Sequence, residues 1–501
     1  MRGFSFLSAL MIGSLVVAAA MTWWILRDNV TSAARGQTLT IHCAAGIKGP
    51  VAEIAKDYEA RFGTRVQLAY GGSGTLLSSL RIRSHGDIYI AGDDSYIDTA
   101  RELGLIAEVL AMATMRPIIA VQKFNPKRVK SYRDLLSPDV RVGLGNPEAA
   151  AVGRIAKMTA TSLSIWEELA SKVTVFKPTV NDLGNDLYIG AIDAAVIWDA
   201  TARQYDGLEI VDDPRLSRHA RQVTLGVLRS CVAPAAALHF ARYLTARNEG
   251  SLAFARHGFT PIDGDVWADV PRLRLMSGAM LRPAIDATIT QFEAREGVKV
   301  NRIYNGCGIL VSQMKAGTIP DAYFSCDQSF LLQVQDRFEP GLTVSRNEIV
   351  MLVARGNPKR LARLADLSST ELRVGLGHPT KSALGALTAA LLERTGHTKK
   401  LAASGNVAVE SATGDLLVNQ IVAGSLDVVL VYRSNAAHVL KHCDVIDMEG
   451  TAARASQPYA IAKNSDYPRL MVRLLDTIRS AASREQFRSL GFHWQNGQKP
   501  K

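Results

Sequence analysis

Two glycine-rich turns contain the residues best suited to bind a ligand. The first is Tyr70-Gly-Gly-Ser-Gly-Thr-Leu76, and the second is Tyr304-Asn-Gly-Cys-Gly-Ile-Leu310. Each follows a β-type run and precedes apolar residues at helical spacing, which predicts a strand-to-helix turn. Backbone N–H groups and the helix dipole at such a turn favour an anion, and Ser73 adds an uncharged hydroxyl donor. A single turn of this kind can also be explained by backbone conformations that glycine adopts easily. The repetition of the turn is what favours an anion site.

The two turns belong to an internal repeat that covers most of the chain. A shift of 234 residues (307 − 73) carries Ser73 to Cys307 and Asp93 to Asp327. A shift of 232 (357 − 125) carries the run Asn-Pro-Lys-Arg at 125–128 to its copy at 357–360. Solenoid repeats are about 20–50 residues long, so copies of this length indicate a duplicated domain. We predict one domain at 38–263, a second at 272–494, and a joint at 264–272.

Short apolar strands alternate with amphipathic helices in each copy. A strand is predicted at 39–43, and apolar residues at 51, 54, 55, 58 and 62 follow at helical spacing. Further strands are predicted at 87–91, 118–121 and 140–144, with counterparts in the second copy. This alternation predicts an α/β fold with mostly parallel sheets. Ligands of such sheets gather at the carboxyl ends of the strands, where helices begin.

The bulk composition is that of a globular protein with an anionic partner. Of the 501 residues, 47% are hydrophobic and 21% are charged, and the net charge is +11. The basic residues are scattered without a nucleic-acid-binding signature, so nucleic acid is not predicted as a partner. The five cysteines include no Cys-x-x-Cys pair and predict neither a disulfide framework nor a zinc site. No cofactor is predicted.

The N-terminal segment 1–27 is predicted to anchor the protein in a membrane. Residues 4–26 carry no charge between Arg2 and Arg27, and Trp23 and Trp24 lie at the outer end. Three alanines at 18–20 also suit a signal-peptidase site, but the apolar run continues beyond them, which favours an uncleaved transmembrane helix. In either case the rest of the chain is predicted to face the periplasm or the cell exterior.

The order of these motifs resembles the type II periplasmic solute-binding proteins, most closely the molybdate- and tungstate-binding proteins of ABC importers. The resemblance rests on Cys-Ala-Ala-Gly-Ile from Cys43, the turn at 70–76, the strand that ends at Asp93, the Asn-Pro loop that ends at Gly153, and Ala-Val-Ile-Trp up to Trp198. It extends over about 38–263 and again over 272–494. It implies that each copy has two α/β lobes joined by two crossing strands, with a small oxyanion between the lobes and an ABC permease as partner.

The resemblance also implies which residues hold the oxyanion. The family uses serine hydroxyls, backbone N–H groups and a tyrosine; in the first copy these positions are Gly46, Ser73, Val152 and Trp198. In the second copy they are Met280, Cys307, Leu384 and Tyr432. Each donor removed from a buried anion site costs about 1–3 kcal/mol, so a molybdate-like oxyanion is implied more firmly than molybdate. Arg154 and Lys381, beside the loops, can supply compensating charge.

The chemistry favours a binding protein over an enzyme. No Gly-x-Ser-x-Gly nucleophile elbow is present, and Gly143-x-Gly145 lacks the third glycine of a dinucleotide site. His438 and His442 have helical spacing but no third ligand, so no metal site is predicted. Two functions stay open: a binding protein that supplies an oxyanion to an ABC importer, and a membrane-anchored, degenerate solute-binding-fold scaffold or sensor that no longer binds an anion.

The lobes and the ranking of the two sites are also predicted. The middle segments, about 116–205 and 348–437, should form one lobe of each copy and the flanks the other, without a single continuous sheet. The first copy is expected to be the better anion site. Ser73 lies among three glycines, whereas Cys307 offers only a weak S–H donor and Met280 fills space that Gly46 leaves open.

Overall fold

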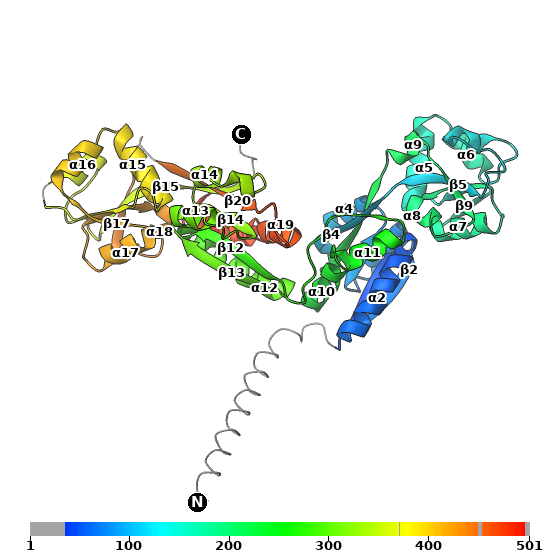
Figure 1. Ribbon diagram of the computed structural model, residues 1–501, viewed down its shortest axis with the longest axis horizontal. Coiled ribbons are helices and arrows are strands. Elements are labelled where there is room, and N and C mark those ends of the chain that lie inside the picture. Colours follow the sequence, from blue (N-terminus) through cyan, green and yellow to red (C-terminus); the bar gives the residue numbers. More distant parts are fainter. Residues whose placement is uncertain (1–35, 370, 449–452, 496–501) are drawn as a thin grey trace, which may run out of the picture. The chain divides into compact units, whose positions relative to one another are not determined.

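The computed structural model describes residues 36–369, 371–448 and 453–495, which divide into two compact units. Unit 1 contains the residues up to 270 together with 295–297, and unit 2 contains 271–294 and the residues from 298 onward. Each unit therefore contains one copy of the repeat (Figure 1). The predicted anchor at 4–26 lies outside the described residues. Within the described part of the chain, no helix combines the length and apolar character needed to cross a membrane.

The flanking segments of the first copy form a six-stranded sheet, which we call its outer lobe. The strand order is β11 (Thr260–Pro261), β4 (Ile106–Met115), β10 (Arg221–Leu228), β3 (Ile88–Ala91), β1 (Thr38–Ala44) and β2 (Arg65–Gly71). β1 is parallel to β2 and β3, whereas β10 is antiparallel to β3 and β4. The principal helices of this lobe are α2 (Lys48–Phe62), α3 (Ser73–Ile82), α4 (Asp94–Glu102), α10 (Pro234–Thr245) and α11 (Gly250–Arg256).

The middle segment of the first copy forms a separate five-stranded sheet, its middle lobe (Figure 1). The order is β7 (Val175–Lys177), β6 (Val142–Gly145), β8 (Ala194–Trp198), β5 (Pro117–Gln122) and β9 (Leu208–Val211). Its helices are α5 (Ala151–Ser162), α6 (Trp166–Lys172), α7 (Val180–Tyr188), α8 (Asp199–Ala202) and α9 (Pro214–Ser217). The chain passes between the lobes twice, at Arg116 and through the segment 212–220 that contains α9.

The second copy repeats these elements. Its outer lobe contains β12 (Arg272–Gly278), β13 (Lys299–Asn305), β14 (Ala322–Phe324), β20 (Arg454–Ile461) and β21 (His493–Trp494), with α12 (Arg282–Glu296), α13 (Cys307–Lys315), α14 (Gln328–Leu332), α19 (Pro468–Ile478) and α20 (Ala481–Ser489). Its middle lobe contains β16 (Val374–Gly377), β17 (Val407–Ser411), β18 (Val428–Tyr432) and β19 (Cys443–Ile446), with α15 (Ala383–Arg394), α16 (Thr398–Ser404), α17 (Gly414–Val422) and α18 (Arg433–Ala436).

One long strand, β15 (Leu342–Ala354), joins the two lobes of the second copy into a single ten-stranded sheet. Its first half pairs with β20 and its second half with β18. The prediction that neither copy forms a continuous sheet is therefore correct for the first copy and wrong for the second. The difference arises at the crossing. Ile349 donates its N–H to the Ala453 carbonyl (3.1 Å), whereas Pro117 at the same place has no N–H to donate.

Each crossing also has an ion pair, and its polarity is reversed between the copies. In the first copy Arg116 lies 3.5 Å from the Asp199 carboxylate, measured from Nε to Oδ2. In the second copy the acid precedes the base, because Glu348 pairs with Arg433 at 4.0 Å. Both pairs connect the crossing segment to the short helix that follows the central strand of the middle lobe, α8 or α18.

The predicted strands and the first helix are present, although the sheets mix parallel and antiparallel neighbours more than expected. Val51, Ile54 and Tyr58 of α2 are buried, as their spacing predicted. The predicted strand at 39–43 is the core of β1. By contrast, His438 and His442 lie in the turn after α18 rather than on the predicted helix.

A polar chain that runs from buried Tyr58 to the more exposed Asp269 fixes the joint onto unit 1. The Tyr58 hydroxyl lies 2.6 Å from His239 Nδ1, and His239 Nε2 lies 2.7 Å from the Asp269 carboxylate. Trp267 packs edge-on against Phe62 and His239. Asp269 and Trp267 both belong to the predicted joint, so this segment is held by specific contacts. Burial lowers the pKa of His239, and Asp269 opposes that effect.

We expect unit 1 to lose stability as the pH falls from 7.5 to 5.5. Unfolded histidine titrates near pH 6.5, while folded His239 has a lower pKa, so the unfolded state takes up a proton first. The stability that His239 contributes is thus present above about pH 6.5 and lost below it. Urea unfolding at both pH values, compared with a His239→Gln variant, measures this. Equal losses in the two proteins would contradict the assignment.

Candidate functional site

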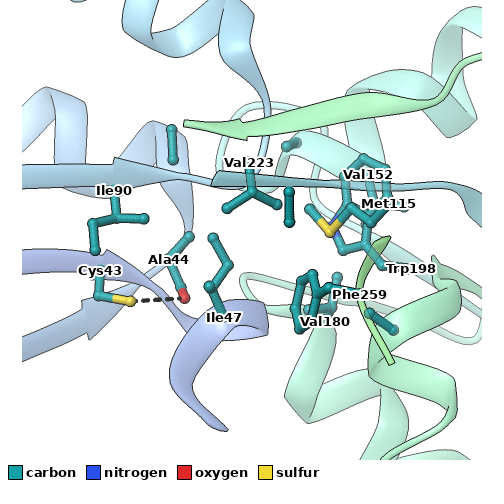
Figure 2. Close-up of a cluster of buried hydrophobic side chains, with 14 of the residues drawn as sticks. Cys43, Ala44, Ile47, Ile90, Met115, Val152, Val180, Trp198, Val223 and Phe259 are labelled. Atoms are coloured by element: carbon teal, nitrogen blue, oxygen red, sulfur yellow. Dashed lines mark hydrogen bonds between the residues drawn. The ribbon is translucent and has the colours of Figure 1, made fainter. Parts of the chain in front are cut away.

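A small cavity lies between the two lobes of the first copy. It is lined by residues 44–47, 71–73, 92, 115, 150–151, 178–180 and 198. Its volume is about 30 Å³, enough for one or two water molecules. Most of the lining side chains are apolar, and Figure 2 shows Ile47, Met115, Val180 and Trp198 among the buried side chains of this region.

Three helices begin at the wall of this cavity. Their first residues are Ser73 of α3, Ala151 of α5 and Val180 of α7, of which α3 belongs to the outer lobe and the other two to the middle lobe. The first N–H groups of a helix have no acceptor inside the helix, and the helix dipole is positive at that end. Three converging N-termini therefore favour a negatively charged ligand without placing a formal positive charge beside it.

Ser73 is the one side chain of the predicted set that brings a hydroxyl to the cavity. It is 3% exposed, and its Oγ accepts the Gly92 N–H at 3.1 Å. The carbonyl of Ser73 accepts the Tyr89 hydroxyl at 2.7 Å. These bonds orient the side chain, and no acceptor among the described residues takes its O–H, which is thus available to a ligand.

The structure brings Gly46 and Trp198 to the same cavity and places Val152 beside it. A Cβ at position 46 would lie 2.8 Å from Val180 Cγ2, so the site has no room for the serine that the resemblance implies there. Trp198 lines the cavity, and Val152 is fully buried one residue after the lining residue Ala151. Only the backbone of Gly46 and Val152 can offer donors, because their side chains have none.

The two lobes of the first copy touch through backbone atoms at the edge of the cavity. Gly74 donates its N–H to the Ala149 carbonyl across the gap, at 3.2 Å. A Cβ on Gly72 would lie 2.4 Å from that same carbonyl oxygen, and a Cβ on Gly74 would lie 2.7 Å from the Glu148 carbonyl. These glycines are therefore required by the close approach of the lobes. We call Gly72, Gly74 and Ala149 the glycine contact of the first copy.

Arg154 strengthens this contact instead of facing the cavity. Its guanidinium lies 3.3 Å from the Asp93 carboxylate and 4.2 Å from the centre of the Tyr96 ring. Arg221 also pairs with Asp93, at 3.4 Å. Asp93 also caps α4, because its side chain accepts the Ser95 N–H. The suggestion that Arg154 supplies charge to the ligand is replaced by an ion pair between the lobes.

The second copy has the same glycine contact but a different donor set. Gly308 donates its N–H to the Lys381 carbonyl at 3.1 Å, and a Cβ on Gly306 would lie 2.4 Å from that carbonyl oxygen. The Lys381 side chain is exposed. Met280, Leu384 and Tyr432 are all buried, as is Cys307.

Cys307 forms a disulfide with Cys326, which corrects two predictions. The cysteines were not expected to pair, and Cys307 was expected to offer an S–H donor, which a disulfide lacks. A comparison of the two copies could have predicted this disulfide. Position 326 corresponds to Gly92 by the shift of 234, and Gly92 touches Ser73, the counterpart of Cys307. The second copy keeps the corresponding hydrogen bond, from the Cys326 N–H to Cys307 Sγ at 3.1 Å, and adds the disulfide between the same two residues.

The sequence matches the family described as bacterial extracellular solute-binding protein twice, over residues 39–260 and 273–493. A putative binding protein of Haemophilus influenzae is 27% identical over 46% of this chain and 94% of its own length. A putative ABC transporter substrate-binding lipoprotein of Bacillus subtilis is 26% identical, covering 49% and 97%. A molybdate-binding protein of Mycobacterium tuberculosis is 25% identical, covering 48% and 90%. Each of these relatives is about as long as one copy of the repeat.

We expect Gly72→Ala to destabilise unit 1 by about 1–3 kcal/mol, the usual range for an overpacked site. The backbone at Gly72 (φ −65°) suits alanine, so the effect comes from the clash with Ala149. Gly207→Ala is the matched control, because its Cβ would meet only the Tyr188 ring at 3.4 Å. Urea unfolding measures both, and an unchanged Gly72→Ala variant would show that the lobes do not approach as described.

Proposed function

The chain belongs to the bacterial extracellular solute-binding proteins, and on this premise we propose that it binds a small oxyanion outside the cytoplasm and delivers it to an ABC importer. Members of this family bind solutes and are not enzymes. The tandem match means that one chain carries two such binding domains. The ligand, its importer and the residues that hold it are the proposed parts.

The observation that carries the proposal is the convergence of α3, α5 and α7 on the cavity of the first copy. Their N-termini and the Ser73 hydroxyl offer neutral donors to a desolvated anion. A tetrahedral oxyanion of the molybdate kind suits such donors, and relatives named molybdate-binding proteins support that class. The proposed ligand positions are Gly46, Ser73, Val152 and Trp198, with Met280, Cys307, Leu384 and Tyr432 at the corresponding places of the second copy.

A ligand can enter this cavity by separation of the lobes. The Gly74–Ala149 bond joins the lobes at the edge of the cavity, so separation would break it. The crossing at Arg116 is the short connection about which the middle lobe can turn, as in hinge closure. The bound ion then replaces water between the helix N-termini.

A degenerate scaffold or sensor is the second candidate, and the contacts of Arg154 favour it. The Arg154–Asp93 ion pair and the glycine contact connect the two lobes directly, through protein atoms. A domain of this kind serves as a rigid extracytoplasmic surface for a protein partner. The two candidates differ in whether any oxyanion binds the purified protein.

Calorimetry with molybdate, tungstate, sulfate and phosphate is expected to show binding of at least one of these ions. Ser73→Ala should weaken that binding about tenfold, because one hydrogen bond to an anion is lost. Ser79→Ala, an exposed serine on the same helix, is the matched control. No heat with any of the four ions favours the scaffold; equal binding by both variants would remove Ser73 from the site.

We also propose that segment 1–27 anchors the protein in the membrane. Cell fractionation should recover the protein with membranes after carbonate washing, and Met1 should still be present. The reason is that the apolar run continues beyond the alanines at 18–20 that would suit a signal peptidase. Mass spectrometry of the purified N-terminus measures this. A mature protein that begins after residue 20 would show a cleaved signal and a free extracytoplasmic protein.

A further inference from the structure

The second copy has polar residues at two positions whose counterparts line the cavity of the first copy. Strand pairing gives the correspondence, since Pro117 lies opposite Trp198 and Ile349 lies opposite Tyr432. Tyr432 therefore occupies the place of Trp198. Asn347, two residues before Ile349, occupies the place of Met115, two residues before Pro117. Met115 and Trp198 both line the cavity of the first copy.

Each of these residues is buried and has a polar atom without a partner. Asn347 is 0% exposed and Tyr432 is 2% exposed. Neither the Nδ2 of Asn347 nor the hydroxyl of Tyr432 meets a hydrogen-bonding partner among the described residues. Ser434, which replaces Ala200 and is 1% exposed, has an unpaired hydroxyl as well. Each unmade bond costs about 1–3 kcal/mol, so three such groups at one crossing indicate that a partner from outside the chain belongs there.

The charge around this cleft does not suit an anion. Asp93 of the first copy is paired with Arg154 and Arg221. Its counterpart Asp327 is buried as well, but alanines stand at the positions of both arginines, Ala386 and Ala455. Within the described residues the Asp327 carboxylate accepts hydrogen bonds only from Ser329 and from the N–H of Ser456.

Asp327 is close enough to act on the unpaired tyrosine. Burial raises the pKa of Tyr432 well above its ordinary value, and the charge of Asp327 raises it further. The tyrosine is therefore a neutral hydroxyl at physiological pH. In the first copy two guanidinium groups neutralise the Asp93 carboxylate, whereas in the second copy no arginine pairs with Asp327 among the described residues. An anion in this cleft would therefore be repelled by the charge of Asp327.

We infer that the cleft of the second copy is a separate binding site, in which Asn347, Tyr432 and Ser434 hold an uncharged solute through its hydroxyl or carbonyl oxygens. An amide NH₂ donates only, whereas the two hydroxyls both donate and accept, so the ligand must present acceptor oxygens and can also donate. A polyol or sugar fits this pattern. The inference rests on the proposed function only in treating each copy as a solute-binding domain; it does not depend on oxyanion binding by the first.

The test is a thermal-shift and calorimetric titration of the full-length protein with two sets of probes. The uncharged probes are glycerol, erythritol, ribose and glucose, and the anions are molybdate, tungstate, sulfate and phosphate. At least one uncharged probe should raise the melting temperature of the wild type. Asn347→Met, which restores the residue type of the first copy, and Tyr432→Phe should each weaken that binding about tenfold. Tyr188→Phe, at an exposed tyrosine, is the control.

A second measurement needs no ligand. Tyr432→Phe removes only a buried hydroxyl that has no partner, so urea unfolding without added solute should show this variant at least as stable as the wild type. Asn347→Met is not used in this comparison, because it also removes the Oδ1 that accepts the Glu348 N–H at 2.8 Å. The inference is overturned if Tyr432→Phe is clearly less stable, if no uncharged probe binds, or if the two variants lose binding of an oxyanion instead. Failure of the proposed oxyanion function appears separately, as an absence of any anion response in every protein, including Ser73→Ala.

Discussion

The close backbone contact between the two lobes of each copy determines how the lobes are placed and where their helices begin relative to one another. In the first copy Gly74 donates to the Ala149 carbonyl, and Gly72 passes so close that no Cβ fits. This contact sets how far apart the two sheets stand and therefore the size of the cavity. It also brings the start of an outer-lobe helix against the starts of two middle-lobe helices. The second copy has the same contact, with Gly306 and Gly308. The backbone arrangement is therefore the same in both copies, although the side chains around it differ.

Within that common frame the side chains give the two clefts different chemistry. Ser73 holds the Gly92 N–H by a hydrogen bond in one copy, and a disulfide joins the corresponding residues Cys307 and Cys326 in the other. Both connections tie the turn to the end of the neighbouring strand. The first leaves a hydroxyl proton for a ligand, whereas the second leaves none. Duplication allows this change, because one copy can keep the original function while the other diverges.

The spacing of apolar residues and the internal repeat made the fold predictable from the sequence. Contacts between residues that lie far apart in the sequence could not be predicted in this way. The spacing of Val51, Ile54 and Tyr58 placed α2, and the shift of 234 residues placed its counterpart. The glycines of the turn were correctly singled out, but they face a carbonyl of the other lobe, which no local pattern reveals. Arg154 was assigned to the ligand because it lies next to the loop in sequence. Its partner Asp93 lies 61 residues away, so only the folded chain shows the pair.

The reversed ion pairs at the crossings bear on how such a chain assembles correctly. Two homologous domains on one polypeptide risk exchanging equivalent segments during folding, as tandem domains of similar sequence do. If the crossing segment of the first copy paired with α18, Arg116 would meet Arg433. If the opposite exchange occurred, Glu348 would meet Asp199. Repulsion between like charges therefore disfavours both exchanged pairings at the crossing between the lobes. The reversed ion pairs thus favour the pairing of each crossing segment with the short helix of its own copy.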